Sequence, residues 1–363
     1  MQIDRRRVLA LGAGLAASAA ATRAMAFAPA RGAPVINGNL ISPVDDETRF
    51  DAETIAQIRA SGLTAFKISL GGSNSDYAWM LEELAFFDRV MALQKDVYAN
   101  VRTLAELDAV ERGRRVGMIY SFESVEMLDG KLDRIDEFHG RGVRVMQLCY
   151  NQPSAFASGV MSRESTGLTP LGHEAVERMN RLGVSIDVSH SDERSTLETL
   201  AASKRPVSVT HAGCAALEAH PRHKSDAVLR AVADQGGVVG IYELPYLTGG
   251  RRQPTVEDYM AHMAHALKVC GEDHVGVGSD ALLTPFDTGP ESMAQWNKSI
   301  AARKAAGVSA PGEGLPPFVE GLNRPDRTAI IAAELARRGY PARVVDKVLG
   351  ANFRRWFGET WVG

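Results

Sequence analysis

Four residues with metal-binding or acid–base side chains stand where apolar, β-branched segments end. Glu123 follows I-Y-S-F, His190 follows I-D-V-S, His211 follows V-S-V-T and Asp280 follows V-G-V-G-S. Two imidazoles and a carboxylate form a ligand set for zinc that leaves open positions for water and substrate. Asp280 would accept the proton of that water or hold a substrate amine. One such histidine alone could equally be a hydrogen-bonded residue at the edge of the fold. The prediction of a zinc-dependent hydrolytic site therefore rests on all four residues together.

The elements that must position these residues alternate along the chain. Short strand-like runs cover 64–70, 116–122, 143–148, 184–189, 207–210, 237–242 and 275–279, with 35–38 as an eighth. Amphipathic helical segments such as 51–62 and 172–183 lie between them, and 342–357 is expected to be a closing helix. This alternation predicts a single-domain α/β fold, a (β/α)8 TIM-type barrel. A doubly wound open sheet is the alternative, but no G-x-G-x-x-G follows the first strand.

Arg222, in E-A-H-P-R-H-K-S-D, follows His211 by one loop. A guanidinium there could hold a substrate carboxylate at two points, although a loop arginine is more often a surface residue. His262 and His265 are spaced as neighbours on one helix face, which favours packing over metal binding. The loops at 243–256 and 283–318 are expected to shape the pocket.

Composition excludes several classes of protein. The chain has 363 residues, 45% of them hydrophobic and 23% charged, with a formal net charge of -3, values typical of a globular protein. Without a basic block, a nucleic-acid partner is not expected. The three cysteines form no C-x-x-C pair, so neither a disulfide framework nor a thiolate zinc site is indicated.

The first 26 residues are interpreted as an export signal. Arg5, Arg6 and Arg7 precede a short alanine-rich apolar run, and Ala24-Met25-Ala26 offers small residues for cleavage. Arg-Arg-x-Val-Leu is similar to a twin-arginine signal, which predicts a periplasmic or secreted protein without a stable membrane span. The alternative is an uncleaved amphipathic N-terminus. Residues 27–363 would then form the barrel domain.

Several long segments together resemble the membrane (renal-type) dipeptidase family of the amidohydrolase-like barrels. The segments are G-L-T-P-L-G-H-E-A-V-E-R-M-N-R-L-G-V-S-I-D-V-S-H-S (167–191), V-T-H-A-G-C-A-A-L-E-A-H-P-R-H-K-S-D (209–226), V-G-V-G-S-D (275–280) and R-R-G-Y-P-A-R-V-V-D-K-V-L-G-A-N-F-R-R (337–355). The resemblance covers roughly residues 110 to 357. It implies a metal-dependent hydrolase of dipeptides or similar small amides, and a homodimer as an option.

The resemblance also implies roles for individual residues. Glu123 matches the carboxylate that bridges two zinc ions in the family, and His190 and His211 match the ligands of the second ion. Asp280 matches the acidic residue near the attacking water and the substrate amine. Arg222 matches the residue that grips the substrate carboxylate.

The sequence departs from the family pattern at the first metal. Asn39 and Ile41 stand where the family has His-x-Asp, and Tyr150, in L-C-Y-N, stands where the family has a substrate-side histidine. An amide is a weak zinc ligand and isoleucine is none. Tyrosine can donate one hydrogen bond to a developing oxyanion. Asp45 or Asp46 could serve as substitute ligands.

These observations predict a hydrolase with one zinc ion, held by the three ligands named above, although two ions remain an option. Asp280 would carry the proton from water to the leaving amine, Tyr150 would stabilise the oxyanion and Arg222 would fix the free carboxylate of a small peptide or amide. The alternative is a catalytically silent relative that binds a peptide or amino acid in the periplasm.

Overall fold

The computed structural model describes residues 33–72, 75–113 and 115–361. The predicted export segment, residues 1–26, lies outside the described residues. Within the described part of the chain, no helix is both long and apolar enough to cross a membrane.

Each of the eight predicted strand segments overlaps a strand. These strands are β1 (Ile36–Asn37), β2 (Ala65–Leu70), β4 (Val116–Phe122), β5 (Val143–Gln147), β6 (Ser185–Asp187), β7 (Val209–Cys214), β9 (Val239–Ile241) and β10 (Val275–Val277). Two short strands were not predicted: β3 (Tyr98–Asn100) pairs with β4, and β8 (His223–Lys224) pairs with β7. Their brevity leaves no apolar run for sequence patterns to detect.

The strands form one parallel sheet that curls into a TIM-like barrel. From β1 the pairing runs through β2, β4 and β5 to β6 in one direction, and through β10 and β9 to β7 in the other. A parallel bridge between Asp187 and Ser208 joins β6 to the residue that precedes β7. The Val188 and Ser208 amides reinforce it by donating to Ser208 O and Ile186 O over 2.9 and 3.1 Å. The carboxyl ends of these strands therefore meet at one mouth, where the candidate residues follow.

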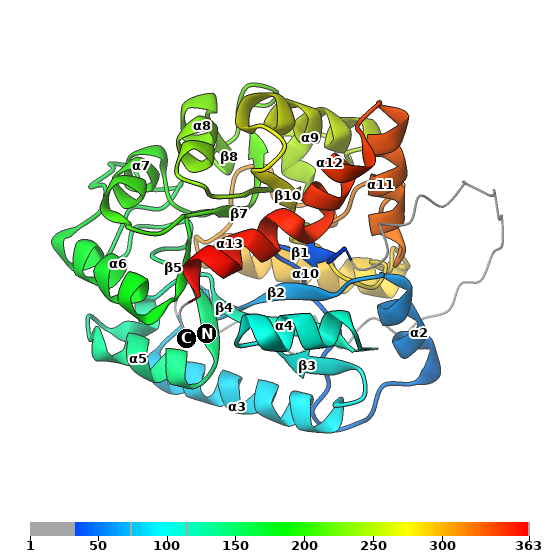
Figure 1. Ribbon diagram of the computed structural model, residues 1–363, viewed down its shortest axis with the longest axis horizontal. Helices are drawn as coiled ribbons and strands as arrows, with labels where there is room; N and C mark the ends of the chain where they lie inside the picture. The colour runs from blue at the N-terminus through cyan, green and yellow to red at the C-terminus, as the bar shows by residue number, and fades with distance from the viewer. Residues whose placement is uncertain (1–32, 73–74, 114, 362–363) are drawn as a thin grey trace.

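Helices surround the strands, because parallel neighbours need crossover connections. They are α2 (Ala52–Ala60), α3 (Tyr77–Leu93), α4 (Leu104–Glu111), α5 (Asp133–Gly140), α6 (Pro170–Leu182), α7 (Glu193–Ala202), α8 (Asp226–Asp234), α9 (Val256–Cys270), α10 (Pro290–Ala305), α11 (Arg327–Arg337), α12 (Ala342–Asp346) and α13 (Asn352–Thr360). Short turns of helix are η1 (Glu126–Leu128), η2 (Pro245–Thr248) and η3 (Lys347–Ala351). Helices α5 to α9 follow one another around the outside of the sheet (Figure 1).

Helix α6 shows why the sequence specifies these elements. The Thr169 side chain accepts a hydrogen bond from the amide of Gly172, and Pro170 occupies the first turn. Ala175, Val176 and Met179 form the buried face, as their spacing predicts. Gly183 ends the helix in the left-handed conformation, with φ 76°, which glycine adopts without steric cost.

The prediction of one closing helix over 342–357 was wrong in its continuity. The chain forms α12, then the π-turn η3, then α13. Gly350 in η3 packs on the backbone, where an added Cβ would lie 2.2 Å from the Pro34 carbonyl oxygen. The same segment brings the Phe353 ring against Gly38 and Gly276, beside β1 and β10. Contact with the barrel strands, which periodicity does not report, therefore interrupts the helix.

Candidate metal centre and substrate cavity

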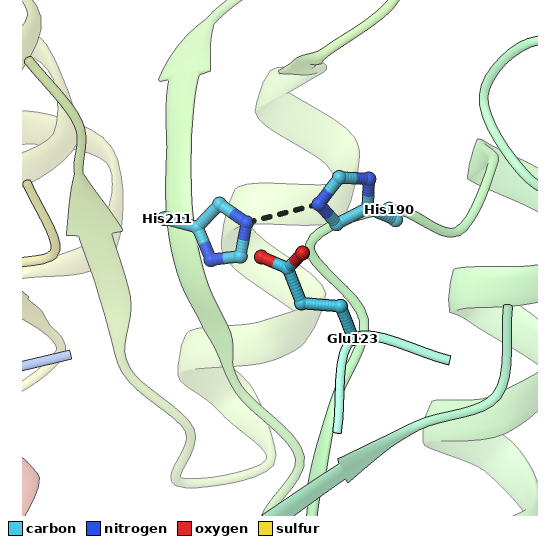
Figure 2. A group of neighbouring side chains, drawn as sticks. All are labelled: Glu123, His190 and His211. Carbon is cyan, nitrogen blue, oxygen red and sulfur yellow. Dashed lines mark hydrogen bonds between the residues drawn. The ribbon is translucent and has the colours of Figure 1, made fainter. Parts of the chain in front are cut away.

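Three side chains from separate strands converge at the mouth of the barrel. Glu123 follows β4, His190 lies three residues after β6, and His211 lies within β7. Their ligand atoms all lie within 4.8 Å of one another, and all three residues are buried (Figure 2). The structure therefore brings together the three residues predicted to bind zinc.

The expected position of His211 after its strand was wrong. Strand β7 begins at Val209 and continues to Cys214, so His211 is inside it. The pairing of β7 with β9 shifts register between Val209 and Ala212, around His211. Such irregularities re-aim side chains in sheets. Here the irregular stretch includes the imidazole that meets Glu123 and His190.

Hydrogen bonds determine which nitrogen of each imidazole carries the proton. Asn151 donates its Nδ2 to the Val308 carbonyl over 3.1 Å, which leaves its Oδ1 to accept from His190 Nδ1 over 2.8 Å. Thr210 Oγ1 donates to Asp187 Oδ2 over 2.6 Å, so it accepts from His211 Nδ1 over 2.9 Å. Both histidines are thus protonated on Nδ1, and the lone pair of each Nε2 is available for a metal.

The two Nε2 atoms face each other at 3.1 Å (Figure 2). Burial, followed by the positive charge of Arg222, holds the pKa of both His190 and His211 well below the ordinary value, so both rings are neutral. Two nitrogens bound to one zinc at tetrahedral angles would lie about 3.3 Å apart, since Zn–N bonds are about 2.0–2.1 Å. Two neutral, unprotonated nitrogens at this spacing beside a carboxylate fit a zinc ion.

The first-metal position of the family is occupied by hydrogen-bonded polar groups. Asn39 donates from Nδ2 to Asp280 Oδ1 over 2.8 Å and accepts at Oδ1 from Ser69 over 2.9 Å. Asp45 and Asp46 do not replace the missing ligands. Asp45 accepts hydrogen bonds within its own turn from Glu47 and Thr48, and Asp46 pairs with Arg89 at 2.7 Å. The alternative of substitute ligands was therefore wrong.

Asp280 lines the same cavity as Glu123 and His190. Its backbone is left-handed, with φ 51°, which is uncommon for a residue other than glycine. Its amide donates to the Asn39 carbonyl oxygen over 2.8 Å, and its carboxylate accepts from the Asn39 side chain. These two bonds hold the strained turn, and such strain often accompanies functional positions.

Arg222 is buried rather than a surface loop residue. Its Nη1 donates to the Ser189 carbonyl over 2.7 Å, while its buried Nη2 has no hydrogen-bond partner among the described residues. The side chain lines the cavity. A buried guanidinium nitrogen without a partner is costly unless something else binds it, so this atom suits an anionic group of a ligand.

Nearby, Lys224 Nζ donates to the carbonyls of Val188 and Ser191 and thereby holds the loop of His190.

Tyr150 stacks on His190, with ring centroids 4.1 Å apart and an angle of 24° between the rings. Arg303 Nη2 donates to its hydroxyl over 3.3 Å. A guanidinium only donates, so the phenolic proton of Tyr150 is left for another acceptor. Glu313 accepts from both Arg303 and Tyr246, which ties α10 to the barrel mouth.

One large cavity contains these groups. It has a volume of about 950 Å³, near the upper end of the range for pockets that hold drug-sized molecules. Its walls include residues of the 283–318 segment, which was expected to be a loop that shapes the pocket. This segment instead contains α10, and half-buried aromatic side chains of the segment, Phe286 and Trp296, face the cavity.

Sequence reasoning missed polar residues that contact the site: Asn151 and Thr210 hydrogen-bond to the two histidines, and Arg303 hydrogen-bonds to Tyr150. It also missed Asp187, which accepts from Thr210, and Lys67, which pairs with Asp187. For Lys67 a signal was present, because a charged residue interrupts the apolar run T-A-F-K-I-S-L. The others are polar residues of ordinary type, and only the fold shows their partners. Cys149 also lies near the site, but burial raises the pKa of its thiol to about 12, which does not suit a nucleophile.

A parallel, TIM-like barrel with two imidazoles and a carboxylate at its mouth is typical of metal-dependent hydrolases. The family model of membrane dipeptidases (peptidase family M19) matches residues 52–303. This match covers more than half of the chain, and the chain therefore belongs to that family.

Individual relatives are similar to this chain over most of its length. The dipeptidase tcpJ of Claviceps purpurea is 26% identical over 281 residues, which are 77% of this chain and 59% of that protein. An uncharacterized protein of Klebsiella pneumoniae is 27% identical over 81% of this chain and 99% of its own length. The crystal structure of an amidohydrolase from Pseudomonas aeruginosa matches with a TM-score of 0.78 and 25% identity, over 91% of this chain and 97% of that one. The chain thus spans about three-fifths of the length of tcpJ.

Proposed function

We propose that this protein is a metal-dependent hydrolase of dipeptides or similar small amides, and that it works with one zinc ion held by Glu123, His190 and His211. The observation that carries the proposal is the pair of unprotonated Nε2 atoms, 3.1 Å apart beside a buried carboxylate. Membership of the dipeptidase family supports the same reaction class. Zinc at this position would supply a Lewis acid and lower the pKa of water.

The residues around the triad would divide the remaining work. Arg222 binds the free carboxylate of the substrate through its unpartnered Nη2. Asp280, held by Asn39, accepts the proton of the attacking water and returns it to the leaving amine. Tyr150 donates a hydrogen bond from its hydroxyl to the developing oxyanion. Its proton is available for this because the Tyr150 oxygen already accepts a hydrogen bond from Arg303.

The size of the cavity favours a substrate larger than a dipeptide with two small side chains. A dipeptide of two alanines has only about a dozen non-hydrogen atoms, whereas pockets of roughly 300–1,000 Å³ hold drug-sized ligands. Phe286 and Trp296 offer an apolar wall for a bulky group. We therefore include amides that carry a large apolar substituent among the proposed substrates.

A catalytically silent binding protein is the second candidate, motivated by Asn39 and Ile41 at the first-metal positions. One experiment separates the two. The purified protein is analysed for metal and incubated with a dipeptide library, with His190→Ala as the control. We expect about one zinc per chain and hydrolysis that His190→Ala abolishes. Zinc binding with no hydrolysis of any dipeptide favours the binding protein, and hydrolysis that survives His190→Ala rejects both the site and the mechanism.

We further propose that residues 27–363 form a single (β/α)8 barrel domain and that the twin-arginine-type segment 1–26 directs it to the periplasm or the medium. Support for export comes from the sequence alone. Fractionation of cells that express the full chain, compared with an Arg5→Lys, Arg6→Lys variant, tests it. Equal export of both proteins would reject the twin-arginine route. The homodimer implied by the resemblance is a proposal that sedimentation of the purified protein tests.

A further inference from the structure

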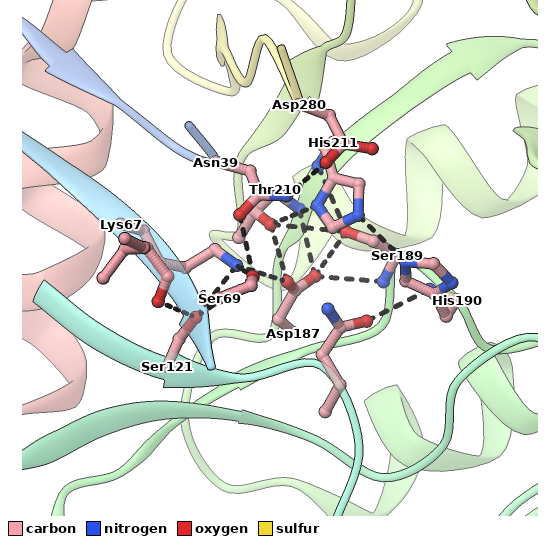
Figure 3. Close-up of polar contacts among 12 residues, drawn as sticks. Asn39, Lys67, Ser69, Ser121, Asp187, Ser189, His190, Thr210, His211 and Asp280 are labelled. Carbon is pink, nitrogen blue, oxygen red and sulfur yellow. Dashed lines mark hydrogen bonds and ion pairs between the residues drawn. The ribbon is translucent and has the colours of Figure 1, made fainter. Parts of the chain in front are cut away.

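A lysine lies inside the barrel beside the metal centre. Lys67 is in the middle of β2, and its side chain is completely buried. Its ammonium donates to Ser69 Oγ and to Ser121 Oγ, each over 3.2 Å, and lies 3.5 Å from the equally buried carboxylate of Asp187 (Figure 3). Burying an ammonium is costly without such partners, so its position is a specific feature of this interior.

One chain, made of an ion pair and two hydrogen bonds, leads from Lys67 to His211. The cation pairs with Asp187, whose Oδ2 accepts from Thr210 Oγ1 over 2.6 Å. Thr210 Oγ1 in turn accepts from His211 Nδ1 over 2.9 Å. The Asp187 carboxylate also accepts from the amides of Ser189 and Thr210, which keeps it in place (Figure 3). The tautomer of His211 that offers Nε2 to a metal therefore depends on a carboxylate paired with Lys67.

A second chain leads from Lys67 to Asp280. Ser69 Oγ accepts from the ammonium and donates to Asn39 Oδ1 over 2.9 Å. Asn39 Nδ2 then donates to Asp280 Oδ1 over 2.8 Å. In each hydrogen bond of this chain the donor is the group nearer to Lys67. The chain ends on the carboxylate of Asp280 (Figure 3). Asn39 thus directs an N–H group toward Asp280, beside Glu123, His190 and His211. A divalent cation bound at this position would need a lone pair instead.

We propose that Lys67 is a positioning residue of the metal centre: its ammonium orients His211 and Asp280 through these two chains, and its charge takes the place of a second metal ion. At the first-metal position, where Asn39 is one serine away from Lys67, the ammonium repels a divalent cation, and in a poorly solvated interior this repulsion is weakly screened. Toward His211 the Asp187 carboxylate lies between and offsets the charge of the ammonium. The part that concerns Asp280 rests on the proposed function. The orientation of His211 and the exclusion of a second ion do not depend on catalysis.

Four single variants of the full chain separate these effects. Lys67→Met removes the charge, Thr210→Val breaks only the chain to His211, and Ser69→Ala breaks only the chain to Asp280. Ser121→Ala is the matched control, because Ser121 contacts Lys67 but belongs to neither chain. Zinc affinity is measured by competition with a chelator, zinc stoichiometry by metal analysis, and folding of the metal-free proteins by thermal unfolding.

We expect Lys67→Met and Thr210→Val to weaken zinc binding by about 10- to 100-fold, as is usual for residues that orient metal ligands. Ser69→Ala and Ser121→Ala should stay within about twofold of the wild type. The wild type should bind one zinc per chain even in excess zinc. Unchanged zinc affinity in folded Lys67→Met, or a second zinc in the wild type, would overturn the proposal.

Loss of the buried cation removes the ion-pair partner of Asp187, so Lys67→Met is compared only if it folds. Lys67→Gln, which keeps a hydrogen-bond donor without the charge, serves if it does not, and wild-type zinc affinity in Lys67→Gln would equally reject the role of the charge. For the chain to Asp280, Ser69→Ala should lower kcat at unchanged zinc affinity, and Lys67→Met should lower both. Absence of turnover in the wild type with normal zinc binding would reject the proposed function and leave the zinc measurements as the test of Lys67.

Discussion

Asn151 Oδ1 accepts a hydrogen bond from His190 Nδ1 over 2.8 Å, while the amide nitrogen of the same asparagine donates to the Val308 carbonyl. Val308 follows α10, so the segment that covers the cavity also determines the orientation of the Asn151 amide. The amide in turn leaves the Nε2 lone pair of His190 directed toward His211. Closure of the cavity wall and preparation of a metal ligand are therefore linked through one side chain.

Removal of this amide should weaken metal binding without unfolding the protein. We expect Asn151→Ala to lower zinc affinity by about 10- to 100-fold, because His190 loses the acceptor that holds its proton on Nδ1. Chelator competition measures the change. Gln152→Ala is the matched control, since Gln152 donates to the neighbouring Gly307 carbonyl and makes no hydrogen bond to His190 among the described residues. If Gln152→Ala lowers zinc affinity as much as Asn151→Ala does, the contact with the segment after α10, and not the tautomer of His190, determines zinc affinity.

Arg222 should determine the preference for a free carboxylate. In the wild type we expect substrates with a free carboxylate to have a higher kcat/KM than the same substrates with a terminal amide. Arg222→Met should reduce this preference by about 10- to 100-fold, since hydrogen bonds to charged groups contribute about 1.5–3 kcal/mol. The ratio of the two kcat/KM values is measured in each protein, so general damage cancels. An unchanged ratio would assign the carboxylate to another residue.

The hydroxyl of Tyr150 should act mainly on turnover. Tyr150→Phe retains the stacking on His190 and removes the hydroxyl, which loses both the hydrogen bond to the oxyanion and the one accepted from Arg303, so we expect kcat to fall by about 100-fold. KM and zinc affinity should change little. Steady-state kinetics and chelator competition test both statements. Wild-type kcat in Tyr150→Phe would exclude the hydroxyl from the chemical step.

The metal-free protein should lose stability in mild acid. Burial lowers the pKa of His223 to about 3 and that of His262 to about 4, and it holds the pKa of His190 and His211 well below the usual value. Below about pH 6.5 the unfolded chain therefore binds more protons than the folded chain, and the free energy of unfolding falls as pH falls.

Each histidine that stays neutral in the folded state contributes a slope of about 1.4 kcal/mol per pH unit in this range. Urea unfolding of chelator-treated protein between pH 7 and pH 5 measures the total, and above pH 5 carboxylates of ordinary pKa contribute little. His173→Gln, which replaces an exposed histidine, should leave the slope unchanged. A free energy of unfolding that is constant between pH 7 and pH 5 would contradict the prediction.

The success of sequence reasoning differed between elements for physical reasons. Strands buried on both faces leave continuous apolar runs, and this is why all eight predicted segments overlap a strand. The boundaries of β7 were misplaced because a register shift depends on the neighbouring strand. The interruption at Gly350 was missed because it arises from contact with the backbone of Pro34, which is far away in the sequence.

By itself, the sequence determined the alternation of strands and helices, the family, and the three residue types that meet at the barrel mouth. These follow from local periodicity and from residues that stand at strand ends. The tertiary structure decided which lone pairs face one another, why Asn39 is a hydrogen-bond donor to Asp280, and that Lys67 lies beside the metal centre. Protonation, tautomers and burial of charge depend on groups brought together from distant parts of the chain, and only the curled arrangement of the parallel strands specifies those neighbours.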